Sequence, residues 1–139
     1  MARPTTLVLD SRDDTSKPSL DAFTIRLEPA LVGVRRVRLL YANIANPEDD
    51  DGELYWYVRI PQLGLGVRGG PGTSGGTFVV PVSSAQGYRT VHRAESEFDS
   101  ILLQEPAGQL DRLDVSLALH NGAAPGLTHD WHLVLGLEY

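Results

Sequence analysis

The chain contains no cysteine, a single lysine and no long apolar run. Without cysteine it has neither a disulfide framework nor a thiolate site. No segment approaches the ~20 apolar residues of a membrane-spanning helix, and Met1-Ala2-Arg3-Pro4 lacks the apolar core of a signal peptide. The net charge of -6 argues against nucleic acid or anionic membrane as a partner, because both attract basic surfaces. We therefore expect no nucleic-acid partner, no membrane partner and synthesis in a cytoplasm.

The basic residues are nearly all arginine, with Lys17 as the only lysine among twelve. Arginine forms bidentate, partly buried contacts that lysine forms poorly, so this bias suits a protein with interfaces. A GC-rich coding sequence produces the same bias without any function. Both interpretations stay open at this point.

The length of 139 residues fits one domain with a real core. We expect residues 1–4 to form a loose arm and residues 5–139 a single domain. The organising stretch is 7–44, where three apolar runs are separated by polar turns. Its middle run alternates, with Phe23, Ile25 and Leu27 on one side, which is typical of a half-buried strand.

Short alternating runs continue along the chain and are interrupted by Gly, Pro, Asn and Asp. They predict strands at 5–9, 23–27, 34–44, 54–60, 77–82, 88–92, 98–103, 113–119 and 131–139. Glu28-Pro29-Ala30 is expected to separate two strands, a β-bulge is expected near Leu39-Leu40, and Pro81 indicates an edge or a strand end. A helical turn is plausible only at 93–97. The prediction is an all-β, single-domain β-sandwich, jelly-roll-like, with eight to nine strands.

Three loops stand out by composition. Residues 10–16 form a dense polar turn in which Arg12 lies among aspartates, and Asp10, Arg12 and Asp13 are its expected structural residues. The acidic loop 46–52 indicates either a solvated turn or a cation site, although it lacks the spacing of an EF-hand. The glycine-rich segment 61–76 lacks a phosphate-loop motif and is expected to be a mobile hairpin loop.

No catalytic or metal-binding motif emerges. The four histidines are His92, His120, His129 and His132. On a strand, His129 and His132 point to opposite faces, and only Asp130 offers a nearby third ligand for a site shared by His120 and His129. There is no GxSxG elbow. We expect no enzymatic activity, no cofactor and no metal.

The segment 54–60 is apolar on both faces, with Leu54, Trp56, Val58 and Ile60 on one and two tyrosines on the other. Tyrosine is enriched at interfaces. The candidate contact residues are therefore Arg35, Arg36, Arg38, Tyr55 and Tyr57, together with the glycine-rich loop. The alternatives are that the tyrosines belong to the core and that the arginines form a solvated strand face.

The chain resembles the small jelly-roll structural proteins of DNA viruses and phages that open with a DSRDR-type turn. The matching patterns are V-L-D-S-R-D at 8–13, F-x-I-R-L-x-x-x-L-x-x-V-x-x-V-R-L-L at 23–40 and I-x-N-P at 44–47. A closing pattern, L-D-R-L-D-V-S-L-x-x-x-N-G at 110–122, precedes an alternating terminal strand. The match covers about half the chain, and residues 53–105 lie outside it. Asp14 and the loop 69–76 depart from the group's pattern.

The resemblance implies a non-enzymatic structural virion protein: a minor capsid, vertex (penton-type) or head-decoration component. Its partners would be the major capsid protein or other virion proteins, and it would form a homo-oligomer, a trimer or pentamer. It would be found in the virion after assembly in the host cytoplasm. One alternative is a carbohydrate-binding, lectin-like module of a host-recognition structure. Another is a small hydrolase, which would require a histidine and a carboxylate to converge in a pocket.

Overall fold

A computed structural model of the chain describes residues 5–45, 54–64, 75–82, 89–93, 100–103 and 109–139. The predicted arm at 1–4, the acidic loop at 46–52, residues 65–74 of the glycine-rich segment and most of the predicted helical turn at 93–97 lie outside these ranges. Within them the protein consists of strands, two short 3-10 turns and connecting loops, with no α-helix.

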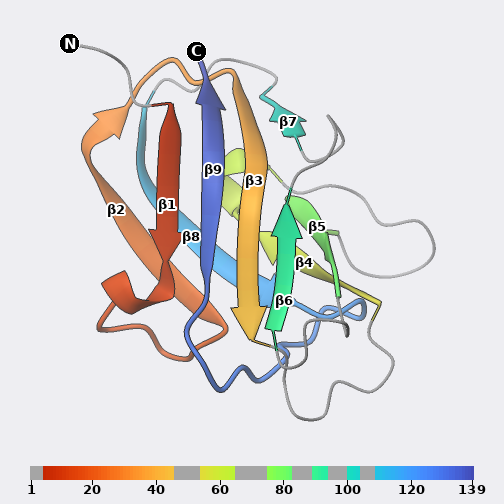
Figure 1. Cartoon of the computed structure of the whole chain (residues 1–139). Coiled ribbons are helices and arrows are strands. Elements are labelled where there is room, and N and C mark those ends of the chain that lie inside the picture. Colours follow the sequence, from red (N-terminus) through yellow and green to blue (C-terminus); the bar gives the residue numbers. More distant parts are fainter. Residues whose placement is uncertain (1–4, 46–53, 65–74, 83–88, 94–99, 104–108) are drawn as a thin grey trace.

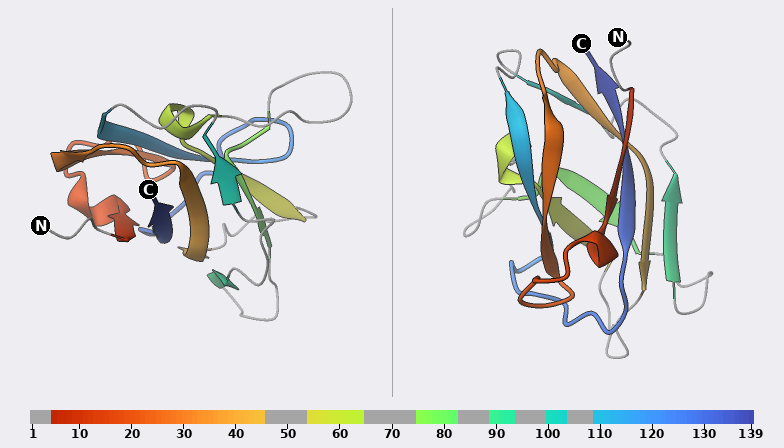
Figure 2. Two further views of the ribbon diagram at one scale, coloured as in Figure 1. Left: turned by 90° about the horizontal axis from the view of Figure 1, so that it is seen from above. Right: turned by 90° about the vertical axis from the view of Figure 1, so that its left-hand side faces the viewer.

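The strands form two antiparallel sheets that pack face to face (Figures 1 and 2). In spatial order, the first sheet contains β1 (Thr6–Asp10), β9 (His132–Glu138), β3 (Arg36–Ala45) and β6 (Arg89–Arg93), with β7 (Ser100–Leu102) also paired to β3. The second sheet contains β2 (Ala22–Leu31), β8 (Leu110–Ala118), β4 (Tyr55–Arg59) and β5 (Phe78–Pro81). The 3-10 turns are η1 (Ser11–Asp13) and η2 (Pro61–Leu63).

The pairing follows the winding of a jelly roll. β1 pairs with β9, β2 with β8, β3 with β6 and β4 with β5. Apart from the short β7, the chain is thus a long hairpin whose successive strand pairs alternate between the two sheets. Eight strands arranged in this order form a jelly roll. The prediction of an all-β, jelly-roll-like sandwich with eight to nine strands is confirmed.

The core lies between the sheets and is built from alternating inward residues. In β9, Leu133, Leu135 and Leu137 are buried, and Trp131 just before the strand is buried on the same side. The rings of Trp131 and Phe23 meet edge to face with centroids 5.1 Å apart, which ties β9 to β2 across the sandwich. The apolar face predicted for the last strand is therefore the core face.

β3 contains the predicted bulge. Leu39 is opposite Leu135 and Tyr41 is opposite Val134, so Leu40 is an extra residue in the pairing. The side chain of Leu40 lies over Gly136, where an added Cβ would be 3.2 Å from Leu40 Cδ1. The bulge shifts the alternation and turns Tyr41 toward the outer face of the sheet.

β2 is longer than predicted. It continues through Glu28-Pro29-Ala30 to Leu31, so these residues, which interrupt the apolar pattern, extend the strand instead of ending it. The register with β8 shifts between Arg26 and Leu31, and β2 is at an edge of its sheet, where a proline needs no ladder partner. Pro81 ends the edge strand β5, as predicted.

The region around β4 differs from the prediction in two places. Leu54 is 77% exposed because it precedes β4, so it does not belong to the core face. Residues 61–64 are not a mobile loop, because η2 buries Leu63 and Thr77 ties the turn to β5. Thr77 Oγ1 accepts a hydrogen bond from Ile60 N (2.8 Å) and donates one to Gly64 O (2.7 Å).

Candidate functional site

The turn after β1 is locked by an aspartate–arginine pair. The Asp10 carboxylate accepts hydrogen bonds from Arg12 N (2.9 Å) and Arg12 Nη2 (2.6 Å), and Arg12 Nε lies 3.1 Å from both carboxylate oxygens. These bonds from Arg12 hold the pKa of Asp10 below its ordinary value. The forked contact is one that lysine could not make.

Ser11 joins this turn to the start of β9. Its side chain is fully buried, and Ser11 Oγ donates to Asp130 Oδ1 (2.7 Å) and accepts from Trp131 N (3.0 Å). Ser11 N donates in turn to Trp131 O (3.0 Å). Three hydrogen bonds therefore join two segments that lie near opposite ends of the sequence. The Ser11 hydroxyl acts in them as both donor and acceptor.

Asp14 also holds this turn in place, although it departs from the pattern of the virion proteins that the chain resembles. Its carboxylate accepts from Thr24 N (2.8 Å) and from Ser16 N (3.1 Å), which lowers the pKa of Asp14. Asp13 is exposed and ends η1. Sequence reasoning singled out Asp13 and missed Asp14, although the Asp-x-Ser spacing of an Asx turn was present at 14–16.

The outer face of the first sheet carries two rows of side chains in cross-strand register. One row contains Val8, Val134, Tyr41 and Arg93, and the other contains Asp10, His132, Asn43 and Val91. The rings of Tyr41 and His132 are stacked with centroids 5.6 Å apart, and the guanidinium of Arg93 lies 5.8 Å from the Tyr41 centroid. Arg93, Tyr41 and His132 thus form a cation–aromatic stack on this face.

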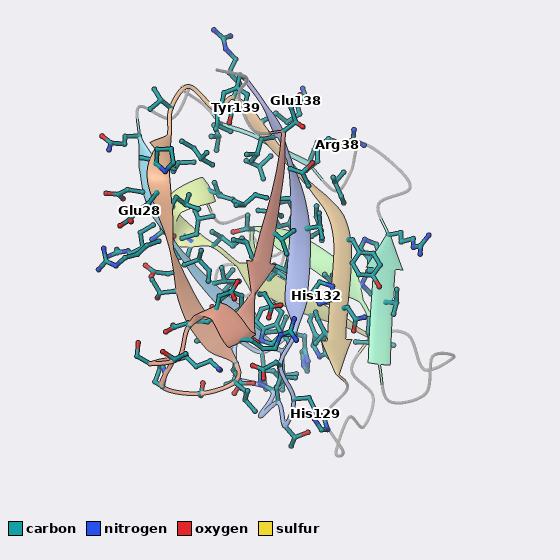
Figure 3. All side chains as sticks on the ribbon, turned by 60° about the vertical axis from the view of Figure 1, so that its left-hand side comes forward. Glu28, Arg38, His129, His132, Glu138 and Tyr139 are labelled. Carbon is teal, nitrogen blue, oxygen red and sulfur yellow. The ribbon has the colours of Figure 1, made fainter. Side chains whose placement is uncertain are left out.

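A hollow of about 420 Å³ adjoins the stack. It is lined by Asp10, Arg12, Asn43, His129, Asp130, Trp131 and His132. Figure 3 shows His129 and His132 at this end of the molecule. The strand geometry that would turn these two histidines to opposite faces does not apply, because β9 begins at His132 and His129 lies in the irregular segment before it.

The hollow brings histidines and carboxylates together, but the carboxylates are engaged. Asp10 is bound by Arg12, and Asp130 is bound by Ser11 and lies 3.4 Å from Lys17 Nζ. In the described part of the chain, no three His, Asp or Glu side chains are arranged to hold a metal ion. The hollow is thus a polar recess lined by two bound carboxylates, two imidazoles and one amide.

The predicted contact residues lie on different faces. Arg36 and Arg38 are on the first sheet, where Arg36 Nε lies 3.4 Å from Glu138 Oε2, and Arg35 is exposed just before β3. Figure 3 shows Arg38 and Glu138 near one end of that sheet.

Tyr55 and Tyr57 are on β4 in the second sheet, with ring centroids 5.3 Å apart. Tyr57 is 6% exposed, which leaves it little surface for a partner. The arginines and the tyrosines therefore do not form one surface.

Both tryptophans are in the core, Trp56 at 0% and Trp131 at 1% exposure. Trp131 Nε1 donates to Leu20 O (2.7 Å), so its polar atom is used inside the protein. The prediction that Trp131 belongs to the core is confirmed. Neither tryptophan is exposed enough for a sugar ring to stack on it.

Among the described residues, no helix is long and apolar enough to cross a membrane. No protein-family model matches the chain, and no curated protein is significantly similar to it.

Proposed function

We propose that the chain is a non-enzymatic structural protein of a virion, a minor capsid, vertex or head-decoration component. In this role it docks on a capsid surface formed by the major capsid protein or another virion protein. It also forms a homo-oligomer with closed symmetry, which would be a trimer or a pentamer. The observation that carries the proposal is the jelly-roll winding, with β1, β9, β3 and β6 in one sheet and β2, β8, β4 and β5 in the other. Viral capsid domains are among the proteins built this way.

The polar turn after β1 supports the proposal. Its aspartate, serine and arginine belong to the segment that resembles virion jelly-roll proteins, and here they hold the chain together. Asp10 binds Arg12, and Ser11 binds the backbone and carboxylate at the start of β9. A motif whose side chains serve the fold in this way suits a protein that acts through its shape and its surfaces.

Two arginines at the start of β3 are the proposed docking groups. Arg35 is exposed just before β3, and Arg38 is half-buried within it. Arginine is enriched at interfaces because its guanidinium makes several hydrogen bonds at once. An acidic or carbonyl-rich patch on the capsid would match this surface.

Particle association tests the proposal. Lysates from infected source cells are fractionated on a density gradient, and the chain is followed by mass spectrometry. We expect it to migrate with assembled particles, and finding it only among free proteins would refute the proposal. Light scattering of the purified protein, with and without calcium, tests the oligomer: a discrete assembly built from three or five chains, single or doubled, would support it.

Charge reversals locate the docking surface. Arg35→Glu combined with Arg38→Glu should release the protein from particles. Arg112→Glu is the matched control, because its side chain is exposed on the second sheet. Equal binding by both variants would exclude the first sheet as the docking surface.

The hollow beside His132 favours a second candidate function, the carbohydrate-binding module. It has room for one or two sugar rings, and the amide and imidazole groups in its lining are of the kinds that bind adjacent hydroxyls. Calorimetric titration with common mono- and disaccharides tests this candidate. Saturable binding that is lost in Asn43→Ala would support it, and no heat at millimolar sugar would exclude it.

A further inference from the structure

We propose that the open side of the sandwich between β1 and β2 is a two-fold contact with a second copy of this chain. β1 and β2 are both terminal strands, one in each sheet. They lie next to each other on the same side of the molecule (Figures 1 and 2). The contact goes beyond the proposed function, because it joins copies in pairs and is separate from the contacts that would close a trimer or pentamer.

The backbone of β1 is prepared to pair on its open side. Thr5 O accepts from Leu137 N (2.9 Å) and Ser11 N donates to Trp131 O (3.0 Å), so the odd-numbered residues of β1 face β9. In an antiparallel ladder the alternate residues direct their N–H and C=O groups away from that partner. Thr6, Val8 and Asp10 therefore present a row of backbone donors and acceptors, and no described strand pairs with them.

β1 also lacks the features that block pairing at other edges. β2 carries Pro29 beside the charged Glu28, and β5 ends in Pro81. From Thr6 to Leu9, β1 has neither proline nor charge, and Val8 is 56% exposed. Natural sheets protect an edge with proline or charge unless the edge is used.

An apolar groove accompanies this edge. It measures about 550 Å³ and lies between the two strands, and its apolar lining includes Leu7, Ile25, Leu27, Leu31 and Tyr139. Val32, at the rim, is 60% exposed. A strand added to β1 would cover the groove and remove this apolar surface from water.

The charges on β2 identify a second copy as the occupant. Arg26 and Glu28 are both exposed on either side of the inward Leu27, and neither forms an ion pair with another described residue. Arg26 lies opposite Arg112 in the ladder, a like-charge pair that is unfavourable within one chain.

A two-fold axis beside Leu27 would place Arg26 of each copy against Glu28 of the other. The same axis, passing beside Val8, would pair the two β1 strands antiparallel. This edge is therefore complementary to itself, as an isologous contact requires.

Sedimentation equilibrium of the full chain over a wide concentration range tests the contact. We expect a mass that the contact doubles: twice the 15.2 kDa of one chain or, where the proposed trimer or pentamer also forms, twice the mass of that assembly. Val8→Lys should raise the dissociation constant by about tenfold or more, because two lysines would then face each other across the axis. Val79→Lys is the matched control, an exposed valine on the edge strand β5, and it should leave association unchanged. Circular dichroism confirms that both variants fold.

Charge reversal tests the symmetry. Arg26→Glu and Glu28→Arg should each weaken the dimer, and the double variant should restore it. A monomer at every concentration, a mass insensitive to Val8→Lys, or a double variant without rescue would each overturn the contact. A trimer or pentamer unaffected by Val8→Lys would overturn it and leave the virion role standing. Conversely, a Val8-dependent dimer would support the contact even if the protein were absent from particles.

Discussion

Replacing Ser11 by alanine tests how much the buried hydroxyl contributes to the fold. The change removes the acceptor of Trp131 N and leaves that N–H buried without a partner. An unsatisfied buried donor costs about 1–3 kcal/mol. Asp130 also loses a bond, but its side chain is 38% exposed and water can replace the donor. We therefore expect Ser11→Ala to lower the free energy of unfolding by about 1–3 kcal/mol.

Urea denaturation followed by tryptophan fluorescence measures this loss, because Trp131 is adjacent to the changed bond. With a denaturant slope of about 1–3 kcal/mol/M, the unfolding midpoint should fall by roughly 1 M. Ser16→Ala is the control, since its hydroxyl is exposed and bonds only the nearby Asp14 carboxylate (3.0 Å). It should change the stability by less than about 0.5 kcal/mol. Equal midpoints for the two variants would refute the role assigned to Ser11.

Three further predictions concern packing and charge. Gly76→Ala should destabilise the protein by about 1–3 kcal/mol in thermal melting, because the added Cβ would lie 2.7 Å from Tyr57 Cβ. Leu39→Ala, in the centre of the core, should cost about 2–5 kcal/mol in chemical denaturation, and a smaller loss would mean that the cavity collapses. Hydrogen bonds from Arg12 and Thr24 lower the pKa of Asp10 and Asp14, so their stabilisation should be complete above the ordinary pKa of 3.8 and vanish as the pH falls through the lowered values. Unfolding free energies measured between pH 7 and pH 2 should show this loss, and Asp10→Asn should reduce its slope.

The fold was predictable from local patterns because the alternation of apolar and polar residues within a strand identifies the side that is buried. The inward series Val37, Leu39, Ala42 and Ile44 changes parity in the middle of β3, and that change marked the bulge. The end of β2 was not predictable in this way. A proline that would terminate a central strand is tolerated at Pro29 because β2 is at the sheet edge, and the position of a strand in its sheet is not a local property.

The surfaces were less predictable because they depend on pairing between distant segments. Asp10 meets His132 and His132 meets Asn43 only through the register of three strands. The tyrosines of β4 alternate as an exposed pair would, yet Tyr57 is 6% exposed, and Gly76 lies against its Cβ. No pattern within 54–60 reports that contact.

The position of β9 affects how the protein is made. This strand follows all others in the sequence but lies between β1 and β3 in the first sheet. A ribosome therefore releases every other strand before the one that joins β1 to β3, and that sheet can be completed only when synthesis of this segment ends. A chain interrupted before β9 would leave the backbone groups of β1 and β3 that normally pair with β9 without partners. Such fragments would be prone to aggregation and degradation. The jelly-roll order thus allows only translation products that include β9 to close the first sheet.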